Sequence, residues 1–229
     1  VFTSAGMNLH NRVPARLELS SGEVFHGWSF GAPRHVAGEA VFQTGMVGYT
    51  ESLTDPSYSG QILVLTYPSI GNYGVPDTNA EDTHGIPVNV ESHRIHATAL
   101  VVADYSEQYS HWAATQTLAN WLVGNDVPAI AGVDTRQLTQ IIRDHGTLLA
   151  RIVVLSDASP LPVFSDPNLR NLVADVAPSE PRTFVGSGAG ENLAPRILVI
   201  DCGMKFNQLR ILLNSGTASV TVVPWDYDF

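Results

Sequence analysis

Cys202 is the single cysteine of the chain and directly follows the apolar run 196–201. A parallel sheet places its sites at the carboxyl ends of its strands, so a thiol at this position could act as a nucleophile. A nucleophile elbow, however, needs glycines two positions before and two positions after the nucleophile, where this chain has Ile200 and Met204. We therefore expect Cys202 to be a small buried residue at the end of a strand, with an independent cysteine hydrolase as the alternative.

Histidine and aspartate side chains form no further catalytic pattern. None of the eight histidines has the spacing of a metal site, and the nearest pair, His93 and His96, is expected to lie in a surface turn. Asp55 and Asp77 each adjoin a proline, and aspartate in such loops accepts hydrogen bonds from nearby backbone amides. Asp201 could order the turn after its strand in the same way.

Loops rich in glycine and hydroxyl groups offer a second kind of chemistry, which is ligand binding. No loop has the pattern G-x-x-x-x-G-K-[ST] or G-x-G-x-x-G, so we expect no nucleotide phosphate site in this chain. Residues 54–59 gather several hydroxyl groups and amides just before an apolar run. They could bind a small zwitterion, and ordinary surface-turn chemistry would produce the same residues.

The composition is that of a folded, acidic protein. A chain of 229 residues suffices for about one and a half domains. Hydrophobic residues make up 44% and charged residues 15%, which excludes a disordered chain, and no apolar run approaches the ~18 residues of a membrane span. The net charge of −10, with Lys and Arg scattered singly, argues against nucleic acid or an anionic membrane as a partner.

Two features indicate the compartment. A single cysteine can form no internal disulfide, which agrees with a reducing environment. Polar residues between Val1 and Arg12 interrupt the apolar core that an export signal would need. We therefore expect a cytoplasmic protein.

Apolar periodicity predicts a β-rich first part with helices. Expected strands cover 15–19, 24–30, 36–42, 61–67, 97–102 and 151–155, and the run 61–67 is apolar enough to be a central strand that Pro68 ends. Residues 45–60 between two of these strands are expected to form one short helical turn and loops. One helix is expected over 111–123 with Ser110 as its cap, and another between an Asp134 cap and Gly146.

The later part of the chain predicts a β-α-β unit. A strand over 196–201, a helix over 207–214 and a strand over 220–224 follow a stretch rich in Pro, Ser, Asp and Gly. Because an open parallel sheet needs more strands to cover both faces, we expect this unit to be incomplete and to expose an apolar face. The fold class is mixed α/β, with an N-terminal extension at 1–14, a β-rich domain with helices at 15–157, a linker at 158–195 and the start of a parallel-sheet domain at 196–229.

Four motifs occur in order along the β-rich part: GEAVFQTGMVGY at 38–49, LTDPSYS at 53–59, TYPSIGN at 66–72 and GVDTRQLT at 132–139. Together they closely resemble the small subunit, or glutamine amidotransferase region, of carbamoyl-phosphate synthase. The resemblance covers 15 to about 154 and resumes at 196–225, where DCGMKFN at 201–207 is similar to the start of a class I glutaminase domain.

The resemblance implies a function, and it implies which step of the reaction each part of the enzyme carries out. In that family the first domain docks on the large synthetase subunit and on the glutaminase domain, which releases ammonia from L-glutamine with a cysteine, a histidine base and an orienting glutamate. The large subunit then combines ammonia with bicarbonate and ATP to make carbamoyl phosphate. Ser57 matches the serine that helps to hold L-glutamine.

The catalytic residues of the family match no residue of this chain. The Gly-x-Cys-x-Gly elbow, the histidine and the glutamate are expected after Phe229, so the resemblance implies that Cys202 is not the nucleophile and that this chain alone is inactive. No metal or cofactor is expected in this chain, while ATP and Mg are expected in the synthetase part.

Motif details favour one branch of the family. Residues 42–49 and 223–226 look more like the eukaryotic version that serves the first step of de novo pyrimidine biosynthesis than the bacterial subunit, with arginine biosynthesis as another setting. The mitochondrial, ammonia-dependent urea-cycle version shares 134–136 and 141–144. An alternative of another class is a non-catalytic docking module that binds a synthetase subunit without glutaminase activity.

Overall fold

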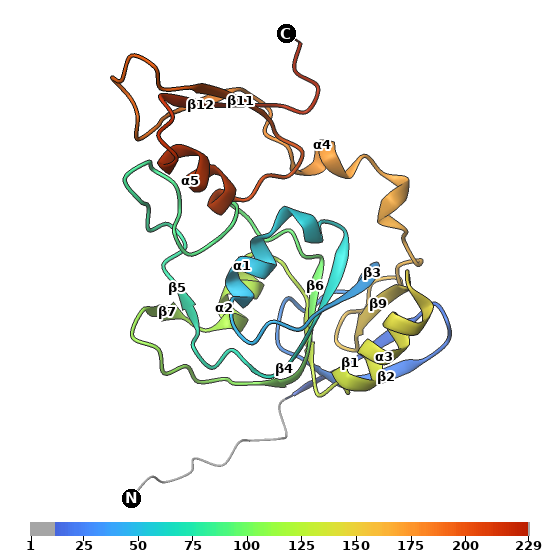
Figure 1. Ribbon diagram of the computed structural model, residues 1–229. Coiled ribbons are helices and arrows are strands. Elements are labelled where there is room, and N and C mark those ends of the chain that lie inside the picture. Colours follow the sequence, from blue (N-terminus) through green and yellow to red (C-terminus); the bar gives the residue numbers. More distant parts are fainter. Residues whose placement is uncertain (1–11, 229) are drawn as a thin grey trace, which may run out of the picture.

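The computed structural model describes residues 12–228, and its largest part is a closed barrel of seven strands (Figure 1). The order around the barrel is β1-β2-β8-β6-β4-β3-β9, in which β8, β6, β4 and β3 are parallel and β1 pairs antiparallel with β2 and β9. The strands are β1 (Val13–Leu19), β2 (Val24–Ser29), β3 (Val36–Gln43), β4 (Gln61–Ile70), β6 (Ala99–Tyr105), β8 (Ala129–Ala131) and β9 (Leu149–Val154). Residues 1–11, and with them most of the expected N-terminal extension and the stretch considered for an export signal, lie outside the described residues.

The central strand β4 is buried on both faces, as its apolar run predicts. Ile62 and Val64 belong to a cluster with members from all seven strands, which is therefore the barrel interior. Leu63 and Leu65 belong to a second cluster outside the barrel, where β4 and β6 are covered by α1 (Tyr49–Thr54) and α2 (Leu118–Gly124). α3 (Thr135–His145) adds two side chains to the interior cluster. The barrel thus has a core inside and a second core under its helices.

The expectation that Pro68 ends the central strand is wrong. β4 continues to Ile70, and its register against β6 shifts between Leu65 and Ser69. Proline is tolerated in a strand at such an irregularity because no ladder hydrogen bond needs its missing N–H. The segment 45–60 also holds more helix than expected, since the 3-10 helix η2 (Pro56–Tyr58) follows α1.

The helix expected over 111–123 begins later than its pattern predicts. α2 starts after Thr117, whose hydroxyl accepts a hydrogen bond from the amide of Asn120 at 3.1 Å, and it does not use Ser110 as a cap. The residues before it form β7 (Ala114–Gln116), which pairs with β5 (Val75–Pro76), so a tertiary pairing overrides the helical pattern. By contrast, α3 has the predicted Asp134 cap, at 2.9 Å from the amide of Gln137, and ends at Gly146. No helix within residues 12–228 is long and apolar enough to cross a membrane.

The C-terminal part forms a second, smaller layer above the barrel (Figure 1). β11 (Arg196–Ile200), α5 (Phe206–Asn214) and β12 (Ser219–Val223) make the predicted β-α-β unit, with the two strands parallel. The stretch 158–195 is partly regular: it contains η3 (Pro167–Leu169), α4 (Leu172–Val176) and β10 (Arg182–Val185), and β10 pairs antiparallel with β12. Leu198 and Ile200 are 50% and 48% exposed, so the expected apolar sheet face is present among the described residues.

Barrel closure depends on a close approach at Gly27 in β2. The pairing of β2 with β8 is short, joining Trp28 to Ala131 and Ser29 to Ile130. A Cβ atom on Gly27 would overlap the carbonyl oxygen of Ala131, which the adjoining pairs hold in place.

Replacing Gly27 with alanine should therefore destabilise the barrel by about 2 kcal/mol, because backbone atoms at this seam cannot move aside without loss of pairing. Denaturant unfolding of the variant measures the change. Gly124→Ala is the matched control, since no heavy atom lies within 4 Å of an added Cβ there and the residue ends helix α2. Equal stability of Gly27→Ala and wild type would contradict this account of barrel closure.

His96 joins α1 to the segment that enters β6. Its backbone amide donates to the carbonyl of Leu53 at 2.9 Å. Burial of the imidazole, with a smaller effect from the neighbouring charge of Arg94, lowers the pKa of His96 from 6.5 to about 4. Folding therefore keeps this imidazole neutral at a pH where the unfolded chain binds a proton.

This pKa shift predicts a loss of stability in acid. Between pH 6.5 and about pH 4 the unfolded state binds one more proton at His96, so the free energy of unfolding should fall as the pH is lowered through that window and level off below it. His96→Gln should show a shallower fall in denaturant unfolding across the same range. The exposed His26 gives the control His26→Gln, which should retain the slope of wild type; identical slopes for all three proteins would contradict the role of His96.

Candidate functional site

Ser57 lies in the short segment that joins α1 to β4. The residue is exposed, and its backbone amide donates to the carboxylate of Asp55 at 2.9 Å, which caps the 3-10 helix η2. Aspartate and proline at the first two positions of the segment thus fix its turn.

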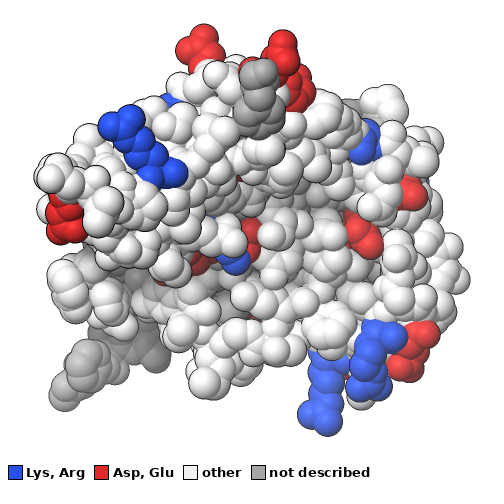
Figure 2. Space-filling model, turned by 45° about the horizontal axis from the view of Figure 1, so that its top comes forward, with Lys and Arg blue, Asp and Glu red and all other residues white. Residues whose placement is uncertain are grey.

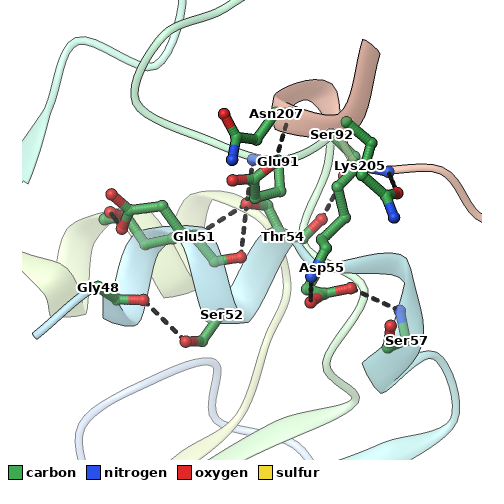
Figure 3. A network of polar contacts seen from close by, with 12 residues as sticks. Gly48, Glu51, Ser52, Thr54, Asp55, Ser57, Glu91, Ser92, Lys205 and Asn207 are labelled. Atoms are coloured by element: carbon green, nitrogen blue, oxygen red, sulfur yellow. Dashed lines mark hydrogen bonds and ion pairs between the residues drawn. The ribbon is translucent and has the colours of Figure 1, made fainter. Parts of the chain in front are cut away.

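Thr54, the last residue of α1, fixes the start of this segment through buried hydrogen bonds (Figure 3). It is 1% exposed, and its hydroxyl donates to the carbonyl of Thr50 at 2.8 Å and accepts from the amide of Glu91 at 2.9 Å. The hydroxyl of Ser92 donates to the Thr54 carbonyl at 2.6 Å. The end of α1 is therefore bound to residues 91–92, which come from a separate loop of the barrel part.

The C-terminal unit, which consists of β10, β11, α5 and β12, contacts the same segment through the start of α5 (Figure 3). The ammonium of Lys205 lies 3.2 Å from the Asp55 carboxylate. The amide of Phe206 donates to the Glu91 carbonyl and the amide of Asn207 donates to the Glu91 carboxylate, both at 2.9 Å. Lys205 at the start of α5 and Glu91 of the loop 77–91 therefore both lie next to the end of α1, although they are far apart in the sequence.

The turn that leads from β11 to α5 is ordered by Asp201, as the sequence suggests. Its carboxylate accepts hydrogen bonds from the amides of Gly203 and Met204, each at 2.7 Å. Gly203 has a φ of +108°, a conformation that L side chains rarely adopt. This turn directs Lys205 and the first turn of α5 toward the barrel.

A second contact fastens the body of α5 to the barrel part. The Arg210 guanidinium donates through Nε to the Asp82 carboxylate at 3.0 Å and through a terminal nitrogen to the Pro87 carbonyl. Ile86, only 2% exposed, packs in a cluster with Leu209 and Leu213 of α5. The loop 77–91 therefore holds the body of α5 by the apolar packing of Ile86 and by the ion pair of Asp82 with Arg210, in addition to the Glu91 contacts at the start of the helix.

Of the cavities that border these contacts, two also border the segment between α1 and β4. One of about 330 Å³ is lined by residues that include Gly48, Glu51, Asp55, Tyr58 and Lys205. The other, of about 590 Å³, lies between the two units and is lined by residues of both, among them Pro56, Arg94, Asp201 and Phe206. Both border the segment that carries Ser57. Figure 2 shows a hollow in this face of the molecule, with acidic and basic side chains inside it.

The smaller cavity is polar and mostly acidic. Carboxylates of Glu51, Asp55 and Glu91 and the ammonium of Lys205 line it. Burial, together with the negative charge of Asp55, raises the pKa of Tyr58 above its ordinary value. The arrangement can bind a small molecule that carries both charged and hydrogen-bonding groups.

The other residues that the sequence analysis considered lie in turns and packing contacts of the fold. Cys202 is exposed, so the expectation of a buried residue is wrong: it stands in the Asp201 turn and not on the buried face of β11. His93 is exposed and its ring packs edge-on against Phe206 with centroids 4.8 Å apart. Asp77 accepts from the amide of Asn79 at 2.9 Å, as predicted. Within residues 12–228 no group of three His, Cys, Asp or Glu side chains could hold a metal ion.

Sequence reasoning missed the residues that hold the site together. Glu91 and Asp82 lie in a loop whose sequence carries no signal of a role. Lys205 lies within the stretch 201–207 that resembles the start of a glutaminase domain, but its partner Asp55 is 150 positions away in the chain. These contacts join residues that are far apart in the sequence, so no local pattern predicts them.

Comparison with known proteins shows the family of the chain. Residues 17–152 match the model of the carbamoyl-phosphate synthase small chain, CPSase domain. The chain is 45% identical to the multifunctional protein URA2 of Saccharomyces cerevisiae over 93% of this chain and 11% of that protein. It is 51% identical to the multifunctional protein CAD of Squalus acanthias over 94% of this chain and 9% of that protein.

A third relative has a different name. The chain is 46% identical to the mitochondrial carbamoyl-phosphate synthase [ammonia] of Homo sapiens over 94% of this chain and 14% of that protein. The chain therefore spans about a tenth of the length of the curated relatives it matches. Because the family model covers more than half of the chain, and the relatives align with nearly all of it, the chain belongs to the carbamoyl-phosphate synthase small chain family.

Proposed function

We propose that this chain is part of a glutamine-dependent carbamoyl-phosphate synthase, in which it helps to bind L-glutamine on the side that supplies ammonia. Its family membership supports the reaction, and the placement of Ser57 supports the substrate. The synthetase part that receives the ammonia would use bicarbonate, ATP and Mg, and would be the partner on which this chain docks.

The observation that carries the proposal is the exposed Ser57 hydroxyl on a segment that both units hold. Asp55 fixes the backbone of Ser57, and Lys205 of the C-terminal unit pairs with Asp55. A serine hydroxyl can donate one hydrogen bond and accept two, which suits the carboxamide and the charged ends of an amino acid.

The cellular role is part of the same proposal. The multifunctional relatives support a eukaryotic protein of de novo pyrimidine biosynthesis. Such a protein would be cytoplasmic, in agreement with the single cysteine and the acidic composition.

A second candidate is an ammonia-dependent synthase, which the similarity to the human protein named for ammonia favours. In that case this chain would serve as a docking and structural module, and Ser57 would have no part in turnover. The two candidates differ in whether loss of the Ser57 hydroxyl affects glutamine use.

Ser57→Ala in the complete protein should raise the KM for glutamine about threefold to tenfold, the effect of losing one hydrogen bond to substrate. Ammonia-dependent carbamoyl phosphate synthesis should stay at the wild-type level, because ammonia bypasses the glutamine site. Steady-state kinetics with each nitrogen donor measures both.

Ser110→Ala is the matched control, since Ser110 is also exposed but lies in the loop between β6 and β7. It should leave both activities unchanged. An equal loss of glutamine- and ammonia-dependent synthesis in Ser57→Ala would refute a glutamine-binding role, and a wild-type protein that uses ammonia alone would favour the second candidate.

A further inference from the structure

We propose that Glu91 is a positioning residue that holds the first turn of α5 against the Ser57 segment and thereby supports glutamine binding. The inference rests on the proposed function for its kinetic consequence. Its structural part rests on contacts of Glu91 with both units.

The first two amides of α5, those of Phe206 and Asn207, obtain their acceptors from the barrel part, whereas the N-cap amide of Lys205 donates to the Gln208 side chain of the same helix at 2.9 Å. The first amides of a helix have no partner within the helix, and a serine, threonine, aspartate or asparagine at the N-cap usually accepts from one of them. The N-cap residue of α5 is Lys205, whose ammonium can only donate. Glu91 replaces that cap, because its carbonyl accepts from Phe206 and its carboxylate accepts from Asn207.

The charge of Glu91 suits this position. The N-terminal end of a helix carries partial positive charge, which a carboxylate stabilises. A hydrogen bond from a backbone amide to a carboxylate is also stronger than one to a neutral oxygen. Glu91 therefore binds α5 more firmly than its backbone carbonyl alone would.

The other side of Glu91 faces the Ser57 segment (Figure 3). Its amide donates to the buried hydroxyl of Thr54, and the next residue, Ser92, bonds to the Thr54 carbonyl. Thr54 stands three positions before Ser57. A chain of contacts therefore runs from Thr54 through Glu91 to Asn207, beside the direct pair of Asp55 with Lys205, and Asp55 in turn accepts from the Ser57 amide.

The body of α5 has separate attachments. The Arg210 contacts with Asp82 and Pro87 and the apolar packing of Ile86 lie beyond the first turn of the helix. Truncation of Glu91 should consequently loosen the first turn of α5 while the helix stays docked. That separation allows a change in glutamine binding without unfolding.

The first test is amide hydrogen exchange in the complete protein. In Glu91→Ala the amides at the start of α5 should exchange about fivefold to tenfold faster, as expected for the loss of a helix cap. Glu91→Gln keeps an acceptor oxygen without the charge, so it should give a smaller increase. The exposed Glu191 provides the control Glu191→Ala, which should leave exchange in α5 unchanged.

The second test is kinetic and uses the same variants. Glu91→Ala should raise the KM for glutamine at least about threefold with little change in ammonia-dependent kcat, and Glu91→Gln should recover part of the wild-type KM. A purely structural residue would instead lower both activities together, and the conservative variant would show no selective recovery.

The outcomes separate this proposal from the proposed function. Unchanged exchange in Glu91→Ala would overturn the capping role, and faster exchange with an unchanged KM for glutamine would overturn the positioning role. If Ser57→Ala alters glutamine use but Glu91→Ala does not, the positioning role fails and the proposed function stands. If the wild-type protein makes no carbamoyl phosphate from glutamine, the proposed function fails and the positioning role fails with it, while exchange still decides whether Glu91 caps α5.

Discussion

The buried hydroxyl of Thr54 is the contact on which the arrangement around Ser57 depends. A hydroxyl removed from water must find both a donor and an acceptor within the protein, or folding loses free energy. Thr54 meets this requirement with the Thr50 carbonyl and the Glu91 amide, so the end of α1 can take only one orientation relative to the loop 77–91. The Asp55 and Ser57 positions follow from that orientation.

The charges at the contact between the two units are arranged asymmetrically. In the two ion pairs that join α5 and its preceding turn to the barrel part, the carboxylates of Asp55 and Asp82 come from the barrel part and the cations of Lys205 and Arg210 come from the C-terminal unit. The Arg210 side chain is 19% exposed and that of Lys205 is 39% exposed, so solvent screens the Arg210 pair less. Arg210 therefore contributes more to holding the two units together. Lys205 contributes mainly its positive charge to the smaller cavity beside Asp55.

Local patterns were sufficient to predict many of the strands and helices, but not the closed barrel that the strands form. The continuous apolar run of β4, the Asp134 cap of α3 and the parallel β-α-β unit depend on residues close in sequence, and the structure has all of them. The start of α2 was mispredicted because the residues before it pair with a distant strand, and the burial of Cys202 because a turn redirects it. The Ser57 position came from a motif, whereas its supports come from contacts that no local pattern encodes.

Helix starts nevertheless contain a signal of such contacts. The N-cap residues Thr117 and Asp134 accept hydrogen bonds from their own helices, and both helix starts are self-sufficient. Gly48 before α1 and Lys205 before α5 have no side-chain acceptor. In both cases a distant residue supplies one: the Tyr73 hydroxyl accepts from the amides at the start of α1, and Glu91 accepts from those of α5. A predicted helix without a competent N-cap residue therefore indicates a tertiary contact at its start. In this protein one such contact holds the N-terminal end of α1, whose other end leads into the segment that carries Ser57, and the other holds α5 beside Thr54.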